Sequence, residues 1–206
     1  MSDSTSSSTS VSTRAAGVLR ALRETYELNV TLVELPDIWR RLRVPSDILL
    51  AHLHSTLQIA FDWDDQHLHC FERSGVRYGT PDDDDRRVHD QSGIRLGTLI
   101  AETGETLHYI YDFGDWWDHR VELVAKRHFS AADTQPHCLA GARAGPPEDC
   151  GGPVGFRQLL AVLADPAHDD YAAKIAWLDG FYFPDHFDAA DVNRRLSRFL
   201  GRGRRK

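Results

Sequence analysis

Apolar and polar residues alternate with a period of two in the first part of the chain, which is typical of half-buried strands. Tyr26, Leu28, Val30 and Leu32 alternate with polar neighbours, and a second such segment, Ile38–Val44, follows a turn at Pro36. These two segments are expected to form a hairpin. Further strands are expected at 67–72, 104–113 and 119–127, and the last two are expected to pair across a turn at Gly114-Asp115.

A helical spacing of apolar residues begins after Pro45, where Ser46 or Asp47 is expected to cap the first turn. His52, Ser55 and Gln58 lie off the apolar stripe, which consists of Leu49, Leu50, Leu53, Leu57, Ala60 and Phe61. Three further helical patterns occur near the C-terminus, and Asp188 is expected to cap the last of them.

The order of these elements predicts an α+β fold. It favours a β-grasp (ubiquitin-like) mixed sheet with one crossing helix and a C-terminal helical annex. The expected parts are a disordered Ser/Thr-rich tail over 1–22, a β-grasp-like core over 23–129, a Pro/Gly-rich loop over 130–153, C-terminal helices packed on the core over 154–200, and a basic tail over 201–206.

Composition narrows the class of protein. Of the 206 residues 41% are hydrophobic and 27% are charged, which is ordinary for a globular chain. No apolar run approaches the ~20 residues that a membrane helix needs, and the N-terminus lacks a secretory pattern, so a cytoplasmic protein without a membrane partner is expected. The three cysteines form no CxxC pair, which argues against a disulfide framework and a zinc ribbon. The net charge of −7 disfavours general affinity for nucleic acid.

Several short segments occur in a characteristic order: Ile38-Trp39-Arg40-Arg41, Trp63-Asp64-Asp65 with His67-Leu68-His69, Tyr111-Asp112-Phe113-Gly114-Asp115, Cys138-Leu139-Ala140-Gly141, and Pro146-Pro147-Glu148-Asp149-Cys150-Gly151-Gly152. Together they closely resemble the plasmid pRi open-reading-frame-three-like family, over roughly Tyr26 to Leu196. Some members carry a transposon-passenger or resolvase-like label, so the resemblance implies an accessory role in mobile elements. The sequence lacks the catalytic serine domain and the clear recognition helix that a serine recombinase needs.

The resemblance also includes one departure. Family members often have Cys where this chain has Gly145, seven residues after Cys138. If the family's cysteines bind metal, this chain lacks one ligand. This absence argues against a cysteine-based metal site. Cys138 and Cys150 are either reactive thiols, which would need a basic neighbour such as His137, or buried structural residues.

A first candidate site contains His67, His69, Asp112, Asp115 and His119. Two histidines spaced by two on a strand point to the same side, and the acids and His119 surround the turn of the neighbouring hairpin. Such a set could hold a divalent metal, zinc or similar, that activates water for hydrolysis. The alternative is structural: the acids cap turns and the histidines pack beside aromatic residues.

A second candidate is a binding surface that comprises Trp39, Trp63, Tyr111, Asp112, Asp115, Trp117, Glu148 and Asp149. Trp116 and Trp117 are neighbours in a turn, so both should not be buried. Glu148 and Asp149, between Pro-Pro and Gly-Gly, could bind a cation, cap the following helix or pair with Arg143.

The C-terminus is basic, and its candidate phosphate contacts are Arg194, Arg195, Arg198, Arg202, Arg204 and Arg205. These could contact nucleic acid weakly, or they could complement the dipole of the last helix. Two functional hypotheses follow. The first is a non-enzymatic binding or accessory module with an unknown protein or nucleic-acid partner, and the second is a metal-dependent hydrolase.

Overall fold

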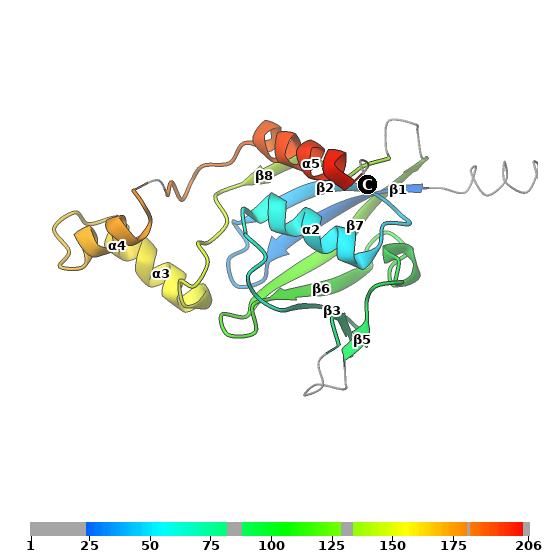
Figure 1. Cartoon of the computed structure of the whole chain (residues 1–206), viewed down its shortest axis with the longest axis horizontal. Coiled ribbons are helices and arrows are strands. Elements are labelled where there is room, and N and C mark those ends of the chain that lie inside the picture. The colour runs from blue at the N-terminus through cyan, green and yellow to red at the C-terminus, as the bar shows by residue number, and fades with distance from the viewer. Residues whose placement is uncertain (1–23, 82–87, 129–133, 181, 204–206) are drawn as a thin grey trace, which may run out of the picture.

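The chain folds around one eight-stranded sheet. The computed structural model describes residues 24–81, 88–128, 134–180 and 182–203, so the expectations for the Ser/Thr-rich tail and for residues 204–206 lie outside the described residues. The strand order is β5-β4-β3-β6-β7-β1-β2-β8 (Figure 1). The strands are β1 (Glu24–Leu32), β2 (Trp39–Pro45), β3 (His69–Arg73), β4 (Val76–Gly79), β5 (Val88–Asp90), β6 (Thr106–Tyr111), β7 (Trp117–His128) and β8 (His137–Ala142).

The two predicted hairpins form the centre of this sheet. β1 pairs antiparallel with β2 and with β7, and β6 pairs antiparallel with β7. The alternating apolar residues of β1 lie in the core, where Leu28 and Val30 are fully buried. Among the named strands, only the β4–β5 pair is parallel.

Helix α2 (Leu50–Phe61) lies across one face of the sheet (Figure 1). The predicted stripe is buried from Leu50 to Phe61, whereas Leu49 is half-buried and precedes the helix. Gln58, which the helical spacing placed off the stripe, is buried as well. The predicted caps at Ser46 and Asp47 are wrong: the helix begins after Leu49, and no side chain caps it. The first amide of the helix instead donates to the main chain of another segment, because the Leu50 amide bonds to the Ile94 carbonyl in the loop between β5 and β6.

The predicted loop over 130–153 contains the edge strand β8, which pairs antiparallel with β2. This correction has a physical reason: the strand sequence His-Cys-Leu-Ala-Gly-Ala consists largely of small residues and carries no alternation that would mark it. The strand brings Pro146–Gly152 back to the end of α2.

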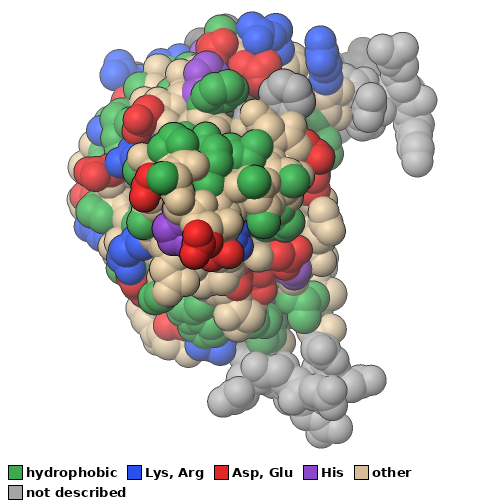
Figure 2. Space-filling model, turned by 90° about the vertical axis from the view of Figure 1, so that its left-hand side faces the viewer, with side chains coloured by type: hydrophobic (Ala, Val, Ile, Leu, Met, Phe, Trp, Pro, Cys, Tyr) green, Lys and Arg blue, Asp and Glu red, His purple; other side chains and the backbone are tan. Residues whose placement is uncertain are grey.

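The three C-terminal helices are confirmed: α3 (Gly152–Leu163), α4 (Tyr171–Trp177) and α5 (Ala189–Gly203). Asp188 caps α5 as predicted, since its Oδ1 accepts from the Ala190 amide at 2.7 Å. α5 packs near α2, whereas α3 and α4 extend from one end of the molecule (Figure 1). Figure 2 shows that end, with apolar side chains gathered over its middle and acidic side chains below them.

The α+β class is therefore confirmed, with α2 as the helix that crosses the sheet. The narrower β-grasp assignment is not confirmed, because the sheet has eight strands, including three short or edge strands, β4, β5 and β8, that the sequence pattern did not predict. Within the part of the chain that the structure describes, no helix is long and apolar enough to cross a membrane.

Candidate functional site

One histidine and three carboxylates converge beside the end of β6. The His67 Nε2 atom lies 3.2 Å from Asp149 Oδ1, 3.6 Å from Glu148 Oε2 and 3.7 Å from Asp112 Oδ2. We call these four residues the His67 cluster. The Asp112 and Glu148 side chains are largely buried, whereas that of Asp149 is 67% exposed, so the cluster opens to solvent on one side.

Two atoms of this cluster lack the hydrogen bonds that buried polar atoms usually form. His67 Nε2 and Glu148 Oε2 are both buried, yet neither has a hydrogen-bond partner. Ligand atoms of His67, Asp112 and Asp149 lie within 4.8 Å of one another. Ligands bound to one ion at about 2.1 Å are roughly 3.0–3.4 Å apart when adjacent. The three nitrogen–oxygen distances lie at or slightly above this range, so small side-chain movements would complete a coordination shell.

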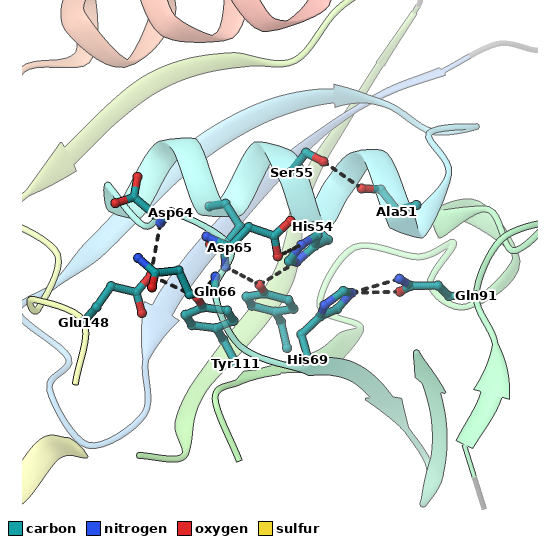
Figure 3. Close-up of polar contacts among 12 residues, drawn as sticks. Ala51, His54, Ser55, Asp64, Asp65, Gln66, His69, Gln91, Tyr111 and Glu148 are labelled. Atoms are coloured by element: carbon teal, nitrogen blue, oxygen red, sulfur yellow. Dashed lines mark hydrogen bonds and ion pairs between the residues drawn. The ribbon is translucent and has the colours of Figure 1, made fainter. Parts of the chain in front are cut away.

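Glu148 is held in place by groups from two other elements. Its Oε1 accepts from the Asp64 amide at 3.0 Å and from the Tyr111 hydroxyl at 2.9 Å (Figure 3). The Tyr111 hydroxyl also accepts from the Gln66 amide at 3.1 Å. Burial, with Glu148 beside it, raises the pKa of Tyr111, so the phenol stays protonated and continues to donate. The other oxygen of Glu148 is thereby left free for a ligand.

The aspartates are positioned by turns with unusual backbone conformations. Asp112 and Asp149 have φ values of 57° and 55°, in the left-handed region that few non-glycine residues adopt. Asp112 Oδ1 accepts from the Gly114 amide at 2.8 Å, which leaves Oδ2 facing His67. Asp115 lies outside the cluster. Its Oδ2 accepts a hydrogen bond from the Gly151 amide at 3.0 Å, which stabilises the loop that carries Asp149.

A second polar group lies next to the first, and sequence reasoning missed most of it. The His54 network consists of His54, Gln58, Asp65, His69, Gln91 and Tyr109. His54 Nε2 lies 2.8 Å from Asp65 Oδ1 (Figure 3). His54 Nδ1 lies 2.8 Å from the Tyr109 hydroxyl. Gln58 donates to that hydroxyl and accepts from the Asp65 amide, which closes a ring of hydrogen bonds. His69 had been named from the sequence as a site residue and Gln58 as a position off the helical stripe, whereas His54, Asp65, Gln91 and Tyr109 had not been assigned to this group.

The His54 network holds the loop that carries His67, but it is a poor metal centre. The rings of His54 and His69 are stacked, with centroids 3.5 Å apart and planes within 5° of parallel. An ion midway between the rings would lie about 1.8 Å out of each ring plane, nearly as far as a metal–nitrogen bond of about 2.1 Å is long. Imidazole lone pairs lie in the ring plane, so both rings cannot bind one ion in this arrangement. His69 instead contacts Gln91.

The five residues proposed from sequence as a metal site thus do not meet at one point. His67 and Asp112 come together, while His69 belongs to the His54 network and Asp115 binds the Gly151 amide. His119 is fully buried in the core, where its Nδ1 lies 3.0 Å from the Trp117 carbonyl oxygen and 3.1 Å from that of Tyr109.

Burial of His119 predicts a loss of stability in acid. Burial lowers its pKa from 6.5 to about 4, so the unfolded state binds the proton first as the pH falls. The contribution of His119 to the free energy of unfolding is fully present above about pH 6.5. It falls progressively towards pH 4, by roughly 3 kcal/mol. Urea unfolding at pH 7.5 and 4.5 should show that His119→Phe reduces this pH dependence. The same pH dependence in both proteins would contradict the assignment.

Most of the tryptophans proposed for a binding surface are core residues. Trp117 is fully buried and Trp63 is 5% exposed, and Tyr111 beneath them is buried too, whereas Trp116 is 44% exposed. The prediction that Trp116 and Trp117 are not both buried is therefore confirmed. Trp63 helps to position the loop that carries Glu148, because its Nε1 donates a hydrogen bond to the Pro146 carbonyl at 2.8 Å. Trp39 lies on β2, paired with Ala142 of the edge strand β8.

Cys138 is buried and Cys150 is half-buried. Burial raises the pKa of Cys138 to about 11 and that of Cys150 to about 12, so neither thiol is activated. A Cβ at Gly145 would lie 2.8 Å from the carbonyl carbon of Phe61 and closer still to its oxygen. The close approach of this loop to the end of α2 thus requires glycine at this position.

The remaining charged candidates are largely paired. Arg195 forms ion pairs with Asp62 and Asp191, and Arg194 lies 2.8 Å from Asp191. Arg143 pairs with Asp185 at 3.0 Å rather than with Glu148 or Asp149, and neither of these acids caps α3. Arg204 and Arg205, and the side chain of Arg202, lie outside the described residues.

Comparisons with known proteins found a family, a relative and a similar solved structure. Residues 24–191 match the family described as plasmid pRiA4b ORF-3-like protein. The chain is 38% identical over 171 residues to uncharacterized protein y4hQ of Sinorhizobium fredii (strain NBRC 101917 / NGR234), covering 81% of this chain and 84% of that protein. It is also similar to the crystal structure of a protein of unknown function, MM3350 of Methanosarcina mazei Go1, with a TM-score of 0.75, 32% identity, and coverage of 82% of this chain and 98% of that one.

Proposed function

The chain belongs to the plasmid pRiA4b ORF-3-like family, and we propose that it is a divalent-metal-binding module whose ion is held by the His67 cluster. The observation that carries this proposal is the group of three carboxylates around the imidazole nitrogen of His67. Two atoms of the group, His67 Nε2 and Glu148 Oε2, are buried without a hydrogen-bond partner. Three negative charges so close together repel unless a cation joins them. One nitrogen and three oxygens suit Mn²⁺, Fe²⁺ or Zn²⁺.

Metal content tests the proposal directly. Purified protein is loaded with Mn²⁺ or Zn²⁺ and desalted, and its metal is measured by plasma mass spectrometry. We expect close to one ion per chain, because the described residues provide one cluster with suitable geometry. Only trace metal after loading with either ion would rule the proposal out.

Metal-dependent hydrolysis is a second candidate. It is favoured by the exposed side of the cluster at Asp149, where an ion could keep a water ligand for activation. A hydrolase would turn over an activated phosphodiester when loaded with metal, whereas a binding module would not. The family resemblance implies an accessory role in mobile elements, and this role stays a prediction. A nucleic-acid contact through the C-terminal arginines also stays a prediction.

A further inference from the structure

A separate cavity of about 250 Å³ lies between the end of α2, the loop 144–147, the segment 182–188 and the start of α5. We call it the Arg40 pocket, after the residue that lines it from β2. Its walls include apolar groups of Pro146, Phe187 and Val192. The His67 cluster includes the next residues of the same loop, Glu148 and Asp149, and these two residues do not line this cavity.

Arg40 brings a buried positive charge to this pocket. The residue is only 2% exposed, and its guanidinium lies between the rings of Phe61 and Phe187, 4.7 and 4.5 Å from their centroids. Its Nε donates to the Ala60 carbonyl at 2.7 Å, and Nη1 donates to those of Trp39 and Ala142 at 2.8 Å. Among the described residues no carboxylate pairs with it and Nη2 has no partner.

Tyr182 also lines this cavity. Its hydroxyl is buried, yet it has no hydrogen-bond partner among the described residues. A buried hydroxyl without a partner costs roughly 1–3 kcal/mol, so a bound acceptor would offset that cost. Burial lowers the pKa of Arg40 to about 10, which leaves the guanidinium charged at neutral pH.

The other charges around the pocket limit what it can hold. Asp62 and Asp191 are engaged by Arg195, and Asp188 caps α5. These acids disfavour a multiply charged anion such as phosphate, whereas one unpaired guanidinium matches a single negative charge. The apolar walls favour a ligand with a hydrocarbon body.

We infer that the Arg40 pocket binds a small organic monocarboxylate, whose oxygens accept hydrogen bonds from Arg40 Nη2 and the Tyr182 hydroxyl. The competing explanation is that Arg40 only ties the carbonyls of α2, β2 and β8 together. That explanation gives no role to the Tyr182 hydroxyl. Replacing Tyr182 therefore separates the two explanations.

Benzoate is the probe, and benzamide is its uncharged analogue of the same shape. Shifts of backbone amide signals are followed by nuclear magnetic resonance during titration of protein dialysed free of divalent ions, since a carboxylate could also bind an ion at the His67 cluster. We expect saturable benzoate binding, at least about tenfold weaker benzamide binding, and shifts confined to residues around the pocket.

Tyr182→Phe should keep or raise the melting temperature, because it removes a buried hydroxyl without a partner, and should weaken benzoate binding about tenfold. Tyr171→Phe on α4 is the matched control and should change neither quantity. The inference is overturned if benzoate gives no saturable shift at millimolar concentration, if benzamide binds equally well, or if Tyr182→Phe leaves benzoate affinity unchanged.

Discussion

Replacing His67 by alanine is expected to weaken Mn²⁺ binding by at least about a hundredfold. The substitution removes the only nitrogen ligand of the His67 cluster, and loss of groups that merely orient ligands already costs about 10- to 100-fold. The fold should persist, because the His67 side chain is 27% exposed and lies at the rim of the cluster. Isothermal titration calorimetry measures the change in affinity.

Two variants serve as references for this result. His52→Ala removes an exposed histidine on α2 and should leave the affinity unchanged. Tyr111→Phe removes the hydroxyl that holds Glu148 Oε1 and should weaken binding about tenfold. If His67→Ala and His52→Ala bind Mn²⁺ equally well, the ion does not lie in this cluster.

Replacing Gly145 by alanine is expected to lower the free energy of unfolding by about 3 kcal/mol or more. The new Cβ would collide with backbone atoms of Phe61, which cannot move without shifting the end of α2. The loop that would have to shift also carries the Pro146 carbonyl, the acceptor for Trp63 Nε1. Chemical unfolding measures the effect.

Gly93→Ala is the matched control, because a Cβ there meets no atom within 4 Å. It should change the free energy of unfolding by no more than about 0.5 kcal/mol. Gly145→Ala should also weaken metal binding, since Glu148 follows three residues later on the displaced loop. Equal stability of the two alanine variants would show that the loop does not press on α2 as described.

The sheet centre was predictable from sequence because its strands carry strong alternation. β1 has apolar residues at every second position, and β6 and β7 are joined by a short turn at Asp112–Trp116. β8 was missed because its small residues have no period, and β4 and β5 because they are short strands at the sheet edge. Edge strands receive their structure from a neighbour, which a local pattern does not reveal.

The residues of the His67 cluster were all named from sequence, but in two separate candidates. His67 was grouped with His69 because a strand was expected to include both. In the structure β3 begins at His69, so His67 lies in the preceding loop and faces Asp112. Glu148 and Asp149 join them because Trp63 and Tyr111 hold their loop across more than thirty intervening residues. Such long-range contacts leave no trace in local spacing.

The most direct test of the account is anomalous X-ray diffraction from crystals loaded with Mn²⁺ or Zn²⁺. We expect one strong anomalous peak within bonding distance, about 2.0–2.3 Å, of His67 Nε2 and of oxygens from Asp112, Glu148 and Asp149. A peak between His54 and His69, or no peak near His67 in fully loaded crystals, would contradict it.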